Sequence, residues 1–421
     1  MSIQTAQKPS APTTYTTRSW LAVAATMVAV AWGGNEFTPL LVMYRETSHF
    51  SQVTVNGLLG AYVLGIIPAL LIGGPLSDRI GRKPTLIPAA PLSLIGSFLL
   101  SIAPNEPLVI AWGRVFCGMA LGLVMAVGST WVAELTARAG GDPAKGARRA
   151  ALCLTAGFLI GAGLASVLAQ WGPWPTHTAY LLHMTLTLLT AWWLSKTPET
   201  RQPERGTVGR TISLLTLGEL AGLLRVPAAA HRRFLRVVVP VAPWVFGCAG
   251  AAYALLPQLL SSSAGSAPIA FSGLMTVVTL GCGALIQIVG KVIDTNRSAR
   301  ASAIAMGIIA VGVALAAVAS HTLQLGLGIL AAATMGAGYG LALVAGLSEV
   351  QRIAGDEDLA GLTAVYYSVS YLGFFIPMAF SALSKVVNFT HLFEIGTVLA
   401  LVCLANVITA WRAHLPGARP A

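Results

Sequence analysis

Two charged side chains stand inside apolar runs of the sequence, where a charge is costly to place. Glu36, preceded by Asn35, lies in the run 20–43, and Arg114 lies in the run 108–132. Counted from the middle of each run at 1.5 Å per residue, they lie about 7 Å and about 9 Å toward the same end. Ionisable residues within membrane-length segments mark ion or substrate pathways by default. A carboxyl can take up and release a proton, so Glu36 is a candidate proton carrier.

The runs that carry these residues belong to a chain that is mostly apolar. Of its 421 residues, 55% are hydrophobic and only 10% are charged, whereas soluble domains carry about 25% charged residues. Each apolar run is near the ~20 residues that cross a bilayer as a helix. The sequence therefore predicts an all-α integral membrane protein with twelve transmembrane helices. The predicted spans are 20–43, 53–76, 86–103, 108–132, 150–170, 177–195, 236–259, 269–290, 299–319, 323–347, 360–384 and 389–411.

The basic residues behind the net charge of +11 are distributed unevenly between the two sides of the membrane. With the loops numbered alternately, 23 of the 26 Lys and Arg fall on one side, and only Arg45 and Lys385 fall on the other. Positive residues concentrate in cytoplasmic loops, so the charge indicates orientation and not nucleic-acid binding. We expect a multi-pass protein of the cell (inner) membrane, with both termini in the cytoplasm. The first run is too long for a signal-peptide core, which predicts an uncleaved first helix.

A basic segment divides the runs into six and six. We predict a disordered cytoplasmic tail at 1–18, a six-helix bundle at 19–195, a cytoplasmic linker at 196–235, a second bundle at 236–412 and a tail at 413–421. Within the linker, Ile212–Leu224 has helical apolar spacing. It is either a helix on the membrane surface or a solvated linker.

Three motifs recur between the halves at nearly one offset. Gly74-x-x-x-Asp78 matches Gly290-x-x-x-Asp294 at 216, three glycines of the fourth run match the tenth at 218, and a Gly-Phe pair of the fifth run matches the eleventh at 216. Parallel repeats related by an axis along the membrane normal occur in transporters. The two bundles should therefore be pseudo-symmetric, with a transport path between them. In the second motif, Gly118, Gly122 and Gly128 match Gly336, Gly340 and Gly346. In the third motif, Gly157 matches Gly373.

A dense charge cluster joins the second and third runs. It reads Gly-x-x-x-Asp-Arg-x-Gly-Arg-Lys and comprises Gly74, Asp78, Arg79, Gly81, Arg82 and Lys83. This pattern resembles the signature loop of the major facilitator superfamily, a resemblance that implies a secondary transporter. Orientation alone explains the Arg and Lys residues but not Asp78 or the two glycines.

The resemblance implies a charge latch that holds the halves together at the cytoplasmic side. We expect its basic residues to meet the acidic loop after the tenth run, as contacts of Arg79, Arg82 or Lys83 with Asp356, Glu357 and Asp358. Asp78 should lie near the start of the eleventh helix. The repeat predicts a second latch, with Gly290, Asp294, Arg297 and Arg300 facing Glu134 and Asp142. Exposed pairs stabilise little, so such latches would act by favouring one conformation.

The Arg114-x-x-x-Gly118 pattern also resembles a family motif of the fourth helix. In the family fold the first and fourth helices line the central cavity, so we expect Glu36 and Arg114 to pair or compete there during proton coupling. The alternatives are a static buried pair and an arginine that reaches the membrane surface. Glu394 is a second acid within a span, in a helix that is peripheral in the family fold.

The fifth run departs from the pattern of the drug-efflux branch. That branch carries Gly-x-x-x-Gly-Pro, whereas Gly157, Gly161 and Gly163 are kept here with Ala162 where proline is expected. The glycines alone are explained by close helix packing. This departure weakens the efflux assignment and leaves the superfamily assignment intact.

Polar and aromatic residues of the second half are candidates for the cavity wall. They are Tyr253, Gln258, Gln287, Tyr339, Tyr366, Tyr367 and Tyr371. We expect proton-coupled export of a small amphipathic or lipophilic compound. The alternative is proton-coupled uptake of a small metabolite, for example an anion bound through Arg114, and the remote alternative is a membrane enzyme or sensor on a transporter fold. The histidines and cysteines lack metal-ligand spacing and the spans contain no paired carboxylates, so we expect neither a metal, a cofactor nor an enzyme. The expected partners are a small-molecule substrate, protons and the lipid bilayer, and the expected state is a monomer.

Overall fold

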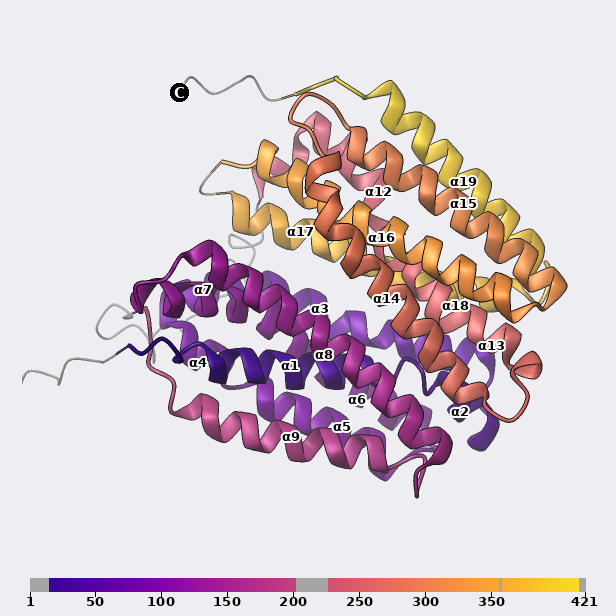
Figure 1. Cartoon of the computed structure of the whole chain (residues 1–421), viewed down its shortest axis with the longest axis horizontal. Coiled ribbons are helices and arrows are strands. Elements are labelled where there is room, and N and C mark those ends of the chain that lie inside the picture. The colour runs from indigo at the N-terminus through magenta and orange to yellow at the C-terminus, as the bar shows by residue number, and fades with distance from the viewer. Residues whose placement is uncertain (1–14, 202–225, 356–357, 416–421) are drawn as a thin grey trace, which may run out of the picture.

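The computed structural model describes residues 15–201, 226–355 and 358–415, and their regular structure is helical. Figure 1 shows two adjacent bundles, one coloured indigo to pink and the other salmon to yellow. Ten helical stretches of these residues are long and apolar enough to cross a bilayer. The first and sixth of the twelve predicted spans are occupied by shorter helices of 15 and 18 residues.

The first half consists of α1 (Leu21–Asn35), α2 (Leu41–Thr47), α3 (Gln52–Ile80), α4 (Arg82–Leu86), α5 (Ala89–Ile102), α6 (Pro107–Leu123), the π-helical turn η1 (Val124–Gly128), α7 (Ser129–Arg138), α8 (Pro143–Trp171) and α9 (Thr178–Ser195). The second half consists of η2 (Pro227–Ala230), η3 (Phe234–Val238), α12 (Val239–Gly250), η4 (Ala251–Leu255), α13 (Leu256–Leu260), η5 (Ser261–Ala264), α14 (Pro268–Ile293), α15 (Arg300–Thr322), α16 (Leu325–Ile353), α17 (Leu359–Tyr371), η6 (Leu372–Phe375), α18 (Ile376–Leu383) and α19 (Phe389–Thr409). Each predicted span therefore corresponds to one helix or to consecutive helical pieces.

The first predicted span is broken, because α1 ends at Asn35 and α2 begins at Leu41. The intervening segment contains Pro39, which has no backbone N–H and disfavours helical geometry at the residue before it. Within it the N–H of Thr38 donates to the carbonyl of Asn35 and not to that of Gly34, its partner in a regular helix. The Gly34 carbonyl is therefore free to accept from another group. Non-helical backbone at membrane depth needs protein or a cavity around it, and residues 31–44 are all buried.

The repeat seen in the sequence corresponds to one helix contact that occurs in both halves. A Cβ added at Gly118 of α6 would meet the carbonyl oxygen of Tyr62 in α3. A Cβ added at Gly336 of α16 would meet the carbonyl oxygen of Thr279 in α14. Small residues let helix backbones approach this closely. The two halves are pseudo-symmetric bundles in which the fourth span packs on the second in the same way.

The ends of the predicted linker belong to the two halves. Arg201 binds Asp78 of the first half, and a Cβ at Gly361 of α17 would lie 2.8 Å from Val226. Arg233, also assigned to the linker, is fully buried in the second half. The predicted helix Ile212–Leu224 lies outside the described residues.

We expect Gly118→Ala to lower the melting temperature of the purified protein by several degrees. The added methyl would press on backbone, and such overpacking destabilises by about 1–3 kcal/mol. Gly307→Ala is the matched control, because its Cβ would have no atom within 4 Å. Differential scanning fluorimetry in detergent measures both, and equal shifts for the two variants would contradict the packing argument.

Candidate functional site

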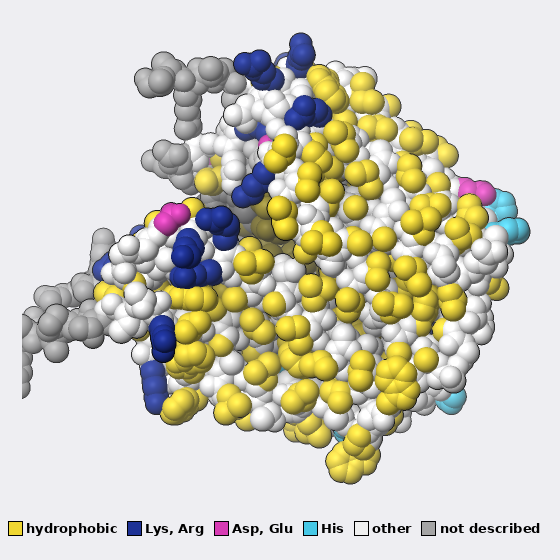
Figure 2. Space-filling model, in the orientation of Figure 1, with side chains coloured by type: hydrophobic (Ala, Val, Ile, Leu, Met, Phe, Trp, Pro, Cys, Tyr) yellow, Lys and Arg dark blue, Asp and Glu magenta, His cyan; other side chains and the backbone are white. Residues whose placement is uncertain are grey.

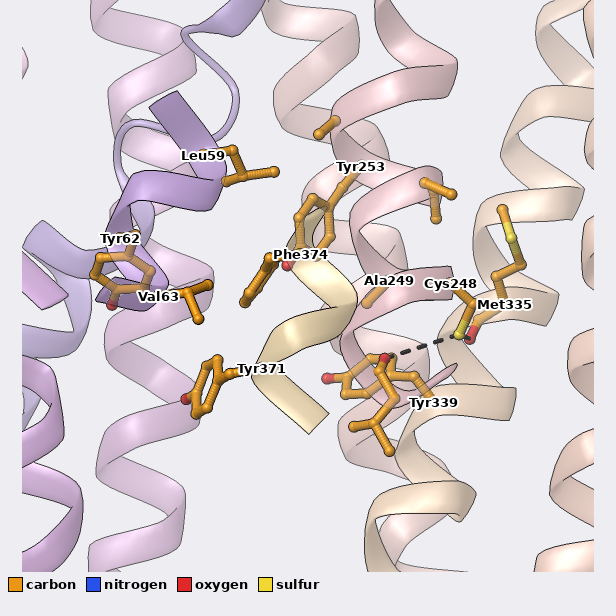
Figure 3. Close-up of a cluster of buried hydrophobic side chains, with 14 of the residues drawn as sticks. Leu59, Tyr62, Val63, Cys248, Ala249, Tyr253, Met335, Tyr339, Tyr371 and Phe374 are labelled. Atoms are coloured by element: carbon orange, nitrogen blue, oxygen red, sulfur yellow. Dashed lines mark hydrogen bonds between the residues drawn. The ribbon is translucent and has the colours of Figure 1, made fainter. Parts of the chain in front are cut away.

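A central cavity of about 180 Å³ lies between the two halves. Its walls are mainly aromatic, and no Asp, Glu, Lys or Arg is among the described residues that line it. Figure 3 shows Tyr62 of α3 near Tyr371 and Phe374, which come from the second half. The lining side chains include Asn35, Tyr62, Met125, Thr155 and Phe158 from the first half and Phe246, Tyr253, Gln287, Tyr339, Tyr367, Tyr371 and Phe374 from the second.

The aromatic wall of the second half is a stacked group. The ring of Phe246 lies 4.3 Å from that of Tyr371 and 5.2 Å from that of Phe374, measured between centroids, and both pairs are stacked. Tyr253, which lies in the π-helical turn η4, is 6.4 Å from Phe374. Offset aromatic pairs add about 0.5–1.5 kcal/mol each beyond their buried area. The group presents ring faces and edges to the cavity, which suits an apolar or aromatic ligand.

A second hollow continues from the central cavity toward the basic end of the molecule. The two share Met125, Leu154 and Tyr367. Its walls are Gly74 and Pro75 of α3 on one side and the first turns of α17 on the other. Figure 2 shows the surface hollowed between the halves near the gathered Lys and Arg side chains. The cavity is therefore approached from the basic end.

The opposite end is closed by hydrogen bonds between the halves. Asn56 of α3 donates through Nδ2 to Oγ of Ser381 at 2.8 Å, and its Oδ1 accepts from Nε2 of Gln258 at 2.9 Å. Phe375 packs against Gly60 of the same helix. Between α8 and α14, Oε1 of Gln170 accepts from two backbone N–H groups at the start of α14. This conformation is sealed at one end and open at the other.

Of the predicted cavity residues, five line the cavity and two do not. The five are Tyr253, Gln287, Tyr339, Tyr367 and Tyr371. Gln258 belongs to the seal described above. Tyr366 is buried within the second half, where its hydroxyl donates to backbone carbonyls of α16 at 3.2 Å.

Arg114 is fully buried beside the cavity and is held by backbone and aromatic rings. Its Nη1 donates to the carbonyl of Gly34 at 3.1 Å, the group that the break after α1 leaves free. Its guanidinium lies 4.2 Å from the ring centroid of Tyr62 and 4.6 Å from that of Phe37. Desolvated cation–π contacts of this kind stabilise by about 2 kcal/mol. Nε and Nη2 have no hydrogen-bond partner among the described residues.

The predicted pairing of Glu36 with Arg114 is not present in this conformation. No ion pair between them exists in the described chain, and Glu36 faces the interior of the first half and not the cavity. Its Oε1 accepts from Oγ of Ser97 at 3.1 Å and lies 3.6 Å from Nδ1 of His183. Glu36 still has helical backbone angles, and consecutive side chains of a helix point about 100° apart, so residues 35 and 36 face different sides. Asn35 reaches the cavity wall and Glu36 does not.

Sequence reasoning overlooked Ser97 and His183 as neighbours of the acid. The sequence could have indicated His183, because it is an ionisable side chain within the predicted span 177–195. Buried histidines in such runs are costly and therefore informative. Ser97 carried no signal, because serines are common in helix contacts within membranes.

The signature loop forms an ion-pair cluster within the first half. The guanidinium of Arg82 binds Asp78 at 2.9 Å and Glu134 of α7 at 2.8 Å, and it donates to Oγ of Ser77 at 2.6 Å. Arg201 lies 3.3 Å from the same Asp78 carboxylate. Arg82 is nearly buried, and a buried ion pair needs such additional hydrogen bonds to offset its desolvation. The cluster ties the ends of α3, α4 and α7 together.

Glu199, which the sequence analysis did not single out, caps α4. Its carboxylate accepts from the backbone N–H of Arg82 at 3.1 Å and of Lys83 at 2.8 Å. Carboxylates at a helix N-terminus satisfy free N–H groups and complement the helix dipole. Gly81 has φ of 106°, and a Cβ there would lie 2.7 Å from Oε2 of Glu199. Glycine at this position is therefore required by both the turn and the cap.

An equivalent cluster lies in the second half. Arg352 of α16 binds Asp294, the repeat of Asp78, and Glu349 at 2.8 Å. Glu349 is also bound by the fully buried Arg233 through both carboxylate oxygens. Asp294 matches Asp78 in the repeat, but its arginine comes from α16 and not from the loop that follows the aspartate. The repeat alone could not have identified Arg352 as the partner.

The first predicted latch differs from the contacts in the structure. Arg82 binds Glu134 of its own half, and Lys83 donates through Nζ to the Ser195 carbonyl at 2.7 Å. No ion pair links this loop to Asp358 in the described chain, and residues 356–357 lie outside it. The loop and the start of α17 stand on opposite sides of the open hollow, which keeps them apart.

The second predicted latch differs in the same manner. Asp294 binds Arg352, and the side chain of Arg300 donates to the carbonyl of Ile293 at 2.6 Å. Among the described residues, no ion pair joins Arg297 to either predicted acid. Asp142 caps α8 by accepting from the N–H of Ala144 at 2.9 Å. Gly290 lies against the second half's own α16.

The three glycines of α8 serve two helix contacts. A Cβ at Gly157 would lie 2.5 Å from the Val28 carbonyl oxygen, and one at Gly161 would lie 2.7 Å from Cα of Trp32. Gly163 instead faces Val277 of α14, at the boundary between the halves. These glycines let α1 approach α8 closely next to the break after Asn35.

The molecule is thus a helical membrane protein of two pseudo-symmetric bundles around a central cavity that is open at one end, an architecture found in secondary transporters. The sequence matches the profile of the Major Facilitator Superfamily over residues 21–378, and the chain belongs to this family.

Similarity to individual relatives covers shorter stretches. A stretch is 31% identical over 131 residues to "Probable inositol transporter 2" of Arabidopsis thaliana, covering 31% of this chain and 19% of that protein. Another is 36% identical over 72 residues to "Multidrug resistance protein MdtL" of Escherichia coli, covering 17% of this chain and 18% of that protein. The matches thus span about a fifth of the length of these curated relatives.

Solved structures share the fold over nearly the whole chain. A POT family transporter in complex with 5-aminolevulinic acid superposes with a TM-score of 0.72 at 13% identity, covering 93% of this chain and 96% of that one. The xylose transporter XylE of E. coli, in a partially occluded inward-open conformation, has a TM-score of 0.66 at 16% identity, covering 94% and 98%. At these identities the likeness shows the fold.

We expect Arg82→Met to lower the melting temperature markedly, because Asp78 and Glu134 would keep their charges without a partner. Breaking a buried pair by removing one partner destabilises by about 3–5 kcal/mol, less where water reaches the site, as it does at Asp78. Arg79→Met is the matched control, since Arg79 is exposed in the same loop. Fluorimetry on both purified variants measures the difference. Similar melting temperatures would show that the cluster has no structural role.

We expect Asn56→Ala to open the sealed end, because it removes both cross-half hydrogen bonds of that side chain. Thr155→Cys in a cysteine-free background provides a reporter in the cavity wall. A membrane-impermeant maleimide added from the side opposite the basic loops should label it several-fold faster in the Asn56→Ala variant. Ser384→Ala is the control, because Ser384 bonds only within its own half. Unchanged labelling would rule out a sealing role for Asn56.

Proposed function

We propose that this transporter couples proton movement to the export of small amphipathic or lipophilic compounds by alternating access. The observation that carries the proposal is the aromatic central cavity, which has an acid and an arginine buried directly behind one wall. A wall of stacked rings without charged lining favours uncharged or weakly polar molecules that bury apolar surface. Asn35, Gln287 and Thr155 can orient such a molecule by hydrogen bonds.

Glu36 and Arg114 are placed to sense the ligand indirectly. Asn35 and Tyr62 line the cavity, while Glu36 follows Asn35 in the chain and Arg114 lies against the ring of Tyr62. A ligand that moves Tyr62 or the Gly34–Asn35 backbone would change the surroundings of Arg114. The altered electrostatic field of Arg114 would in turn change the proton affinity of Glu36. Coupling in this proposal passes through the cavity wall and not through a direct Glu36–Arg114 pair.

The proposed cycle uses the two ends of the molecule in turn. The basic end, which we assign to the cytoplasm by the positive-inside rule, is open in this conformation. Opening the Asn56 seal while closing the hollow would expose the cavity to the other side. We place the protein as a monomer in the cytoplasmic membrane with both termini inside, and its halves at 19–195 and 236–412 with the linker between them.

Uptake of a small metabolite is the second candidate. It is favoured by the relatives named as inositol, polyol and trehalose transporters. Recognition of an anion through Arg114 is not supported, because Arg114 is not among the residues that line the cavity. A polyol would have to be bound by the few amide and hydroxyl groups of the wall.

Transport assays in everted vesicles with an imposed pH gradient distinguish these functions. We expect uncharged aromatic amphiphiles to collapse the gradient, and Glu36→Gln to abolish the effect because a glutamine cannot carry the proton. Inositol and xylose form the second panel, and Glu394→Gln is the control acid. Collapse by the sugars alone would favour the second candidate, and collapse that persists in Glu36→Gln would exclude Glu36 as the carrier.

A further inference from the structure

Glu36, Ser97 and His183 form a hydrogen-bonded chain inside the first half. Ser97 Oγ lies 3.1 Å from Oε1 of Glu36 and 2.7 Å from Nδ1 of His183. All three residues are fully buried, and they come from the segment after α1, from α5 and from α9. The second carboxylate oxygen, Oε2, has no hydrogen-bond partner in the described chain. Within the described chain the serine thus links the two ionisable groups by hydrogen bonds, and their nearest atoms, Oε1 of Glu36 and Nδ1 of His183, lie 3.6 Å apart.

The far side of the imidazole determines which nitrogen carries hydrogen. Nε2 of His183 lies 3.1 Å from the backbone carbonyl of Ala29, a group that can only accept. This contact favours the tautomer with hydrogen on Nε2, in which the hydroxyls of Thr187 at 3.0 Å and Ser93 at 3.4 Å are further partners of that nitrogen. In the neutral ring, Nδ1 is then an acceptor.

A count of hydrogens shows that the chain is one proton short when Glu36 is ionised and His183 is neutral. Ser97 has one hydroxyl hydrogen, yet it faces two acceptors, the carboxylate oxygen and Nδ1. One added proton satisfies both contacts in either of two ways. A protonated Glu36 donates to Ser97, which donates to Nδ1, or a protonated His183 donates to Ser97, which donates to the carboxylate. Unmade hydrogen bonds of buried groups are costly, so the geometry favours binding one proton.

The charges around this chain are few. Among the described residues, the cation near the acid is Arg114, and the other ionisable neighbours, Tyr44, Tyr180 and Cys117, are of types that carry no charge at neutral pH. A Cβ at Gly33 would overlap the imidazole ring, so α1 and His183 are in direct contact. Movement of α1 during transport would therefore change the Ser97 bridge as well as the position of the acid.

We infer that the transported proton is held jointly by Glu36 and His183 through the hydroxyl of Ser97, not by Glu36 alone. The role in transport rests on the proposed function, but the proton sharing itself does not need a substrate. Transfer along the chain moves one proton from the carboxyl to the serine oxygen while the serine hydrogen moves to Nδ1, so charge and atoms balance. His183 is then the second holder of the proton, and Ser97 is the positioning residue that connects it to Glu36.

Infrared difference spectroscopy of the purified chain against pH tests the sharing directly. The carbonyl stretch of a protonated carboxyl should titrate in the wild type and disappear in Glu36→Gln. His183→Phe removes one place for the proton and frees Ser97 to donate to the carboxylate. The midpoint of the Glu36 band should then fall by about one pH unit or more, toward lower pH.

The bridge is tested by a second variant that perturbs packing less. Ser97→Ala removes the hydrogen bond that stabilises the carboxylate, so the midpoint should rise. In the Ser97→Ala background, adding His183→Phe should no longer lower the midpoint, which is the signature of coupling through the hydroxyl. Ser97→Thr keeps the hydroxyl and should restore the wild-type midpoint. His177→Phe and Ser101→Ala are the controls, since neither side chain contacts Glu36.

Each outcome decides the inference separately from the transport function. A midpoint that is unchanged in His183→Phe, or that falls equally with and without Ser97, overturns the sharing. A band that survives Glu36→Gln shows that the titrating acid is another residue and also overturns it. Loss of substrate-driven gradient collapse in vesicles with intact band shifts would instead refute the proposed function alone.

Discussion

The interruption of the first helix after Asn35 is the constraint on which the site depends. A continuous helix would use the Gly34 carbonyl internally and would leave the buried charge of Arg114 without a polar partner. The break supplies that acceptor, and it lies directly after two consecutive residues of which Asn35 faces the cavity and Glu36 the bundle interior. Unwound backbone beside a central cavity is how transporters place ion and substrate groups within a membrane.

Close packing supports this unwound segment from both sides. Gly157 and Gly161 bring α8 onto α1, and Gly118 brings α6 onto α3 in front of Arg114. In lipid, helix association relies on such contacts and on interhelical hydrogen bonds, because burying apolar surface gains little there. The glycines that the repeat identified are therefore the residues that hold the site's shape.

The charge clusters at the basic end each lie within one half, as far as the described residues show. Arg82 and Arg352 each bind an Asp at the end of one helix and a Glu at the end of another. The contacts between the halves lie elsewhere, at the Asn56 seal, at the bonds of Gln170 to α14 and at the packing of Gly163 on Val277. Stiff halves and weak contacts between them suit alternating access.

The sequence alone determined the twelve spans, the two related halves and the superfamily, because hydropathy, charge asymmetry and a dense motif are local patterns. It also identified Glu36 and Arg114, since charges within apolar runs are conspicuous. Only the tertiary structure decided what these side chains contact. The contacts of a side chain depend on its direction near a helix break and on the helices that pack around it. In the structure Glu36 therefore contacts His183 and Ser97, and the predicted pair of Glu36 with Arg114 is not formed. The same reason gives Arg82 of the signature loop its partners Asp78 and Glu134 within its own half.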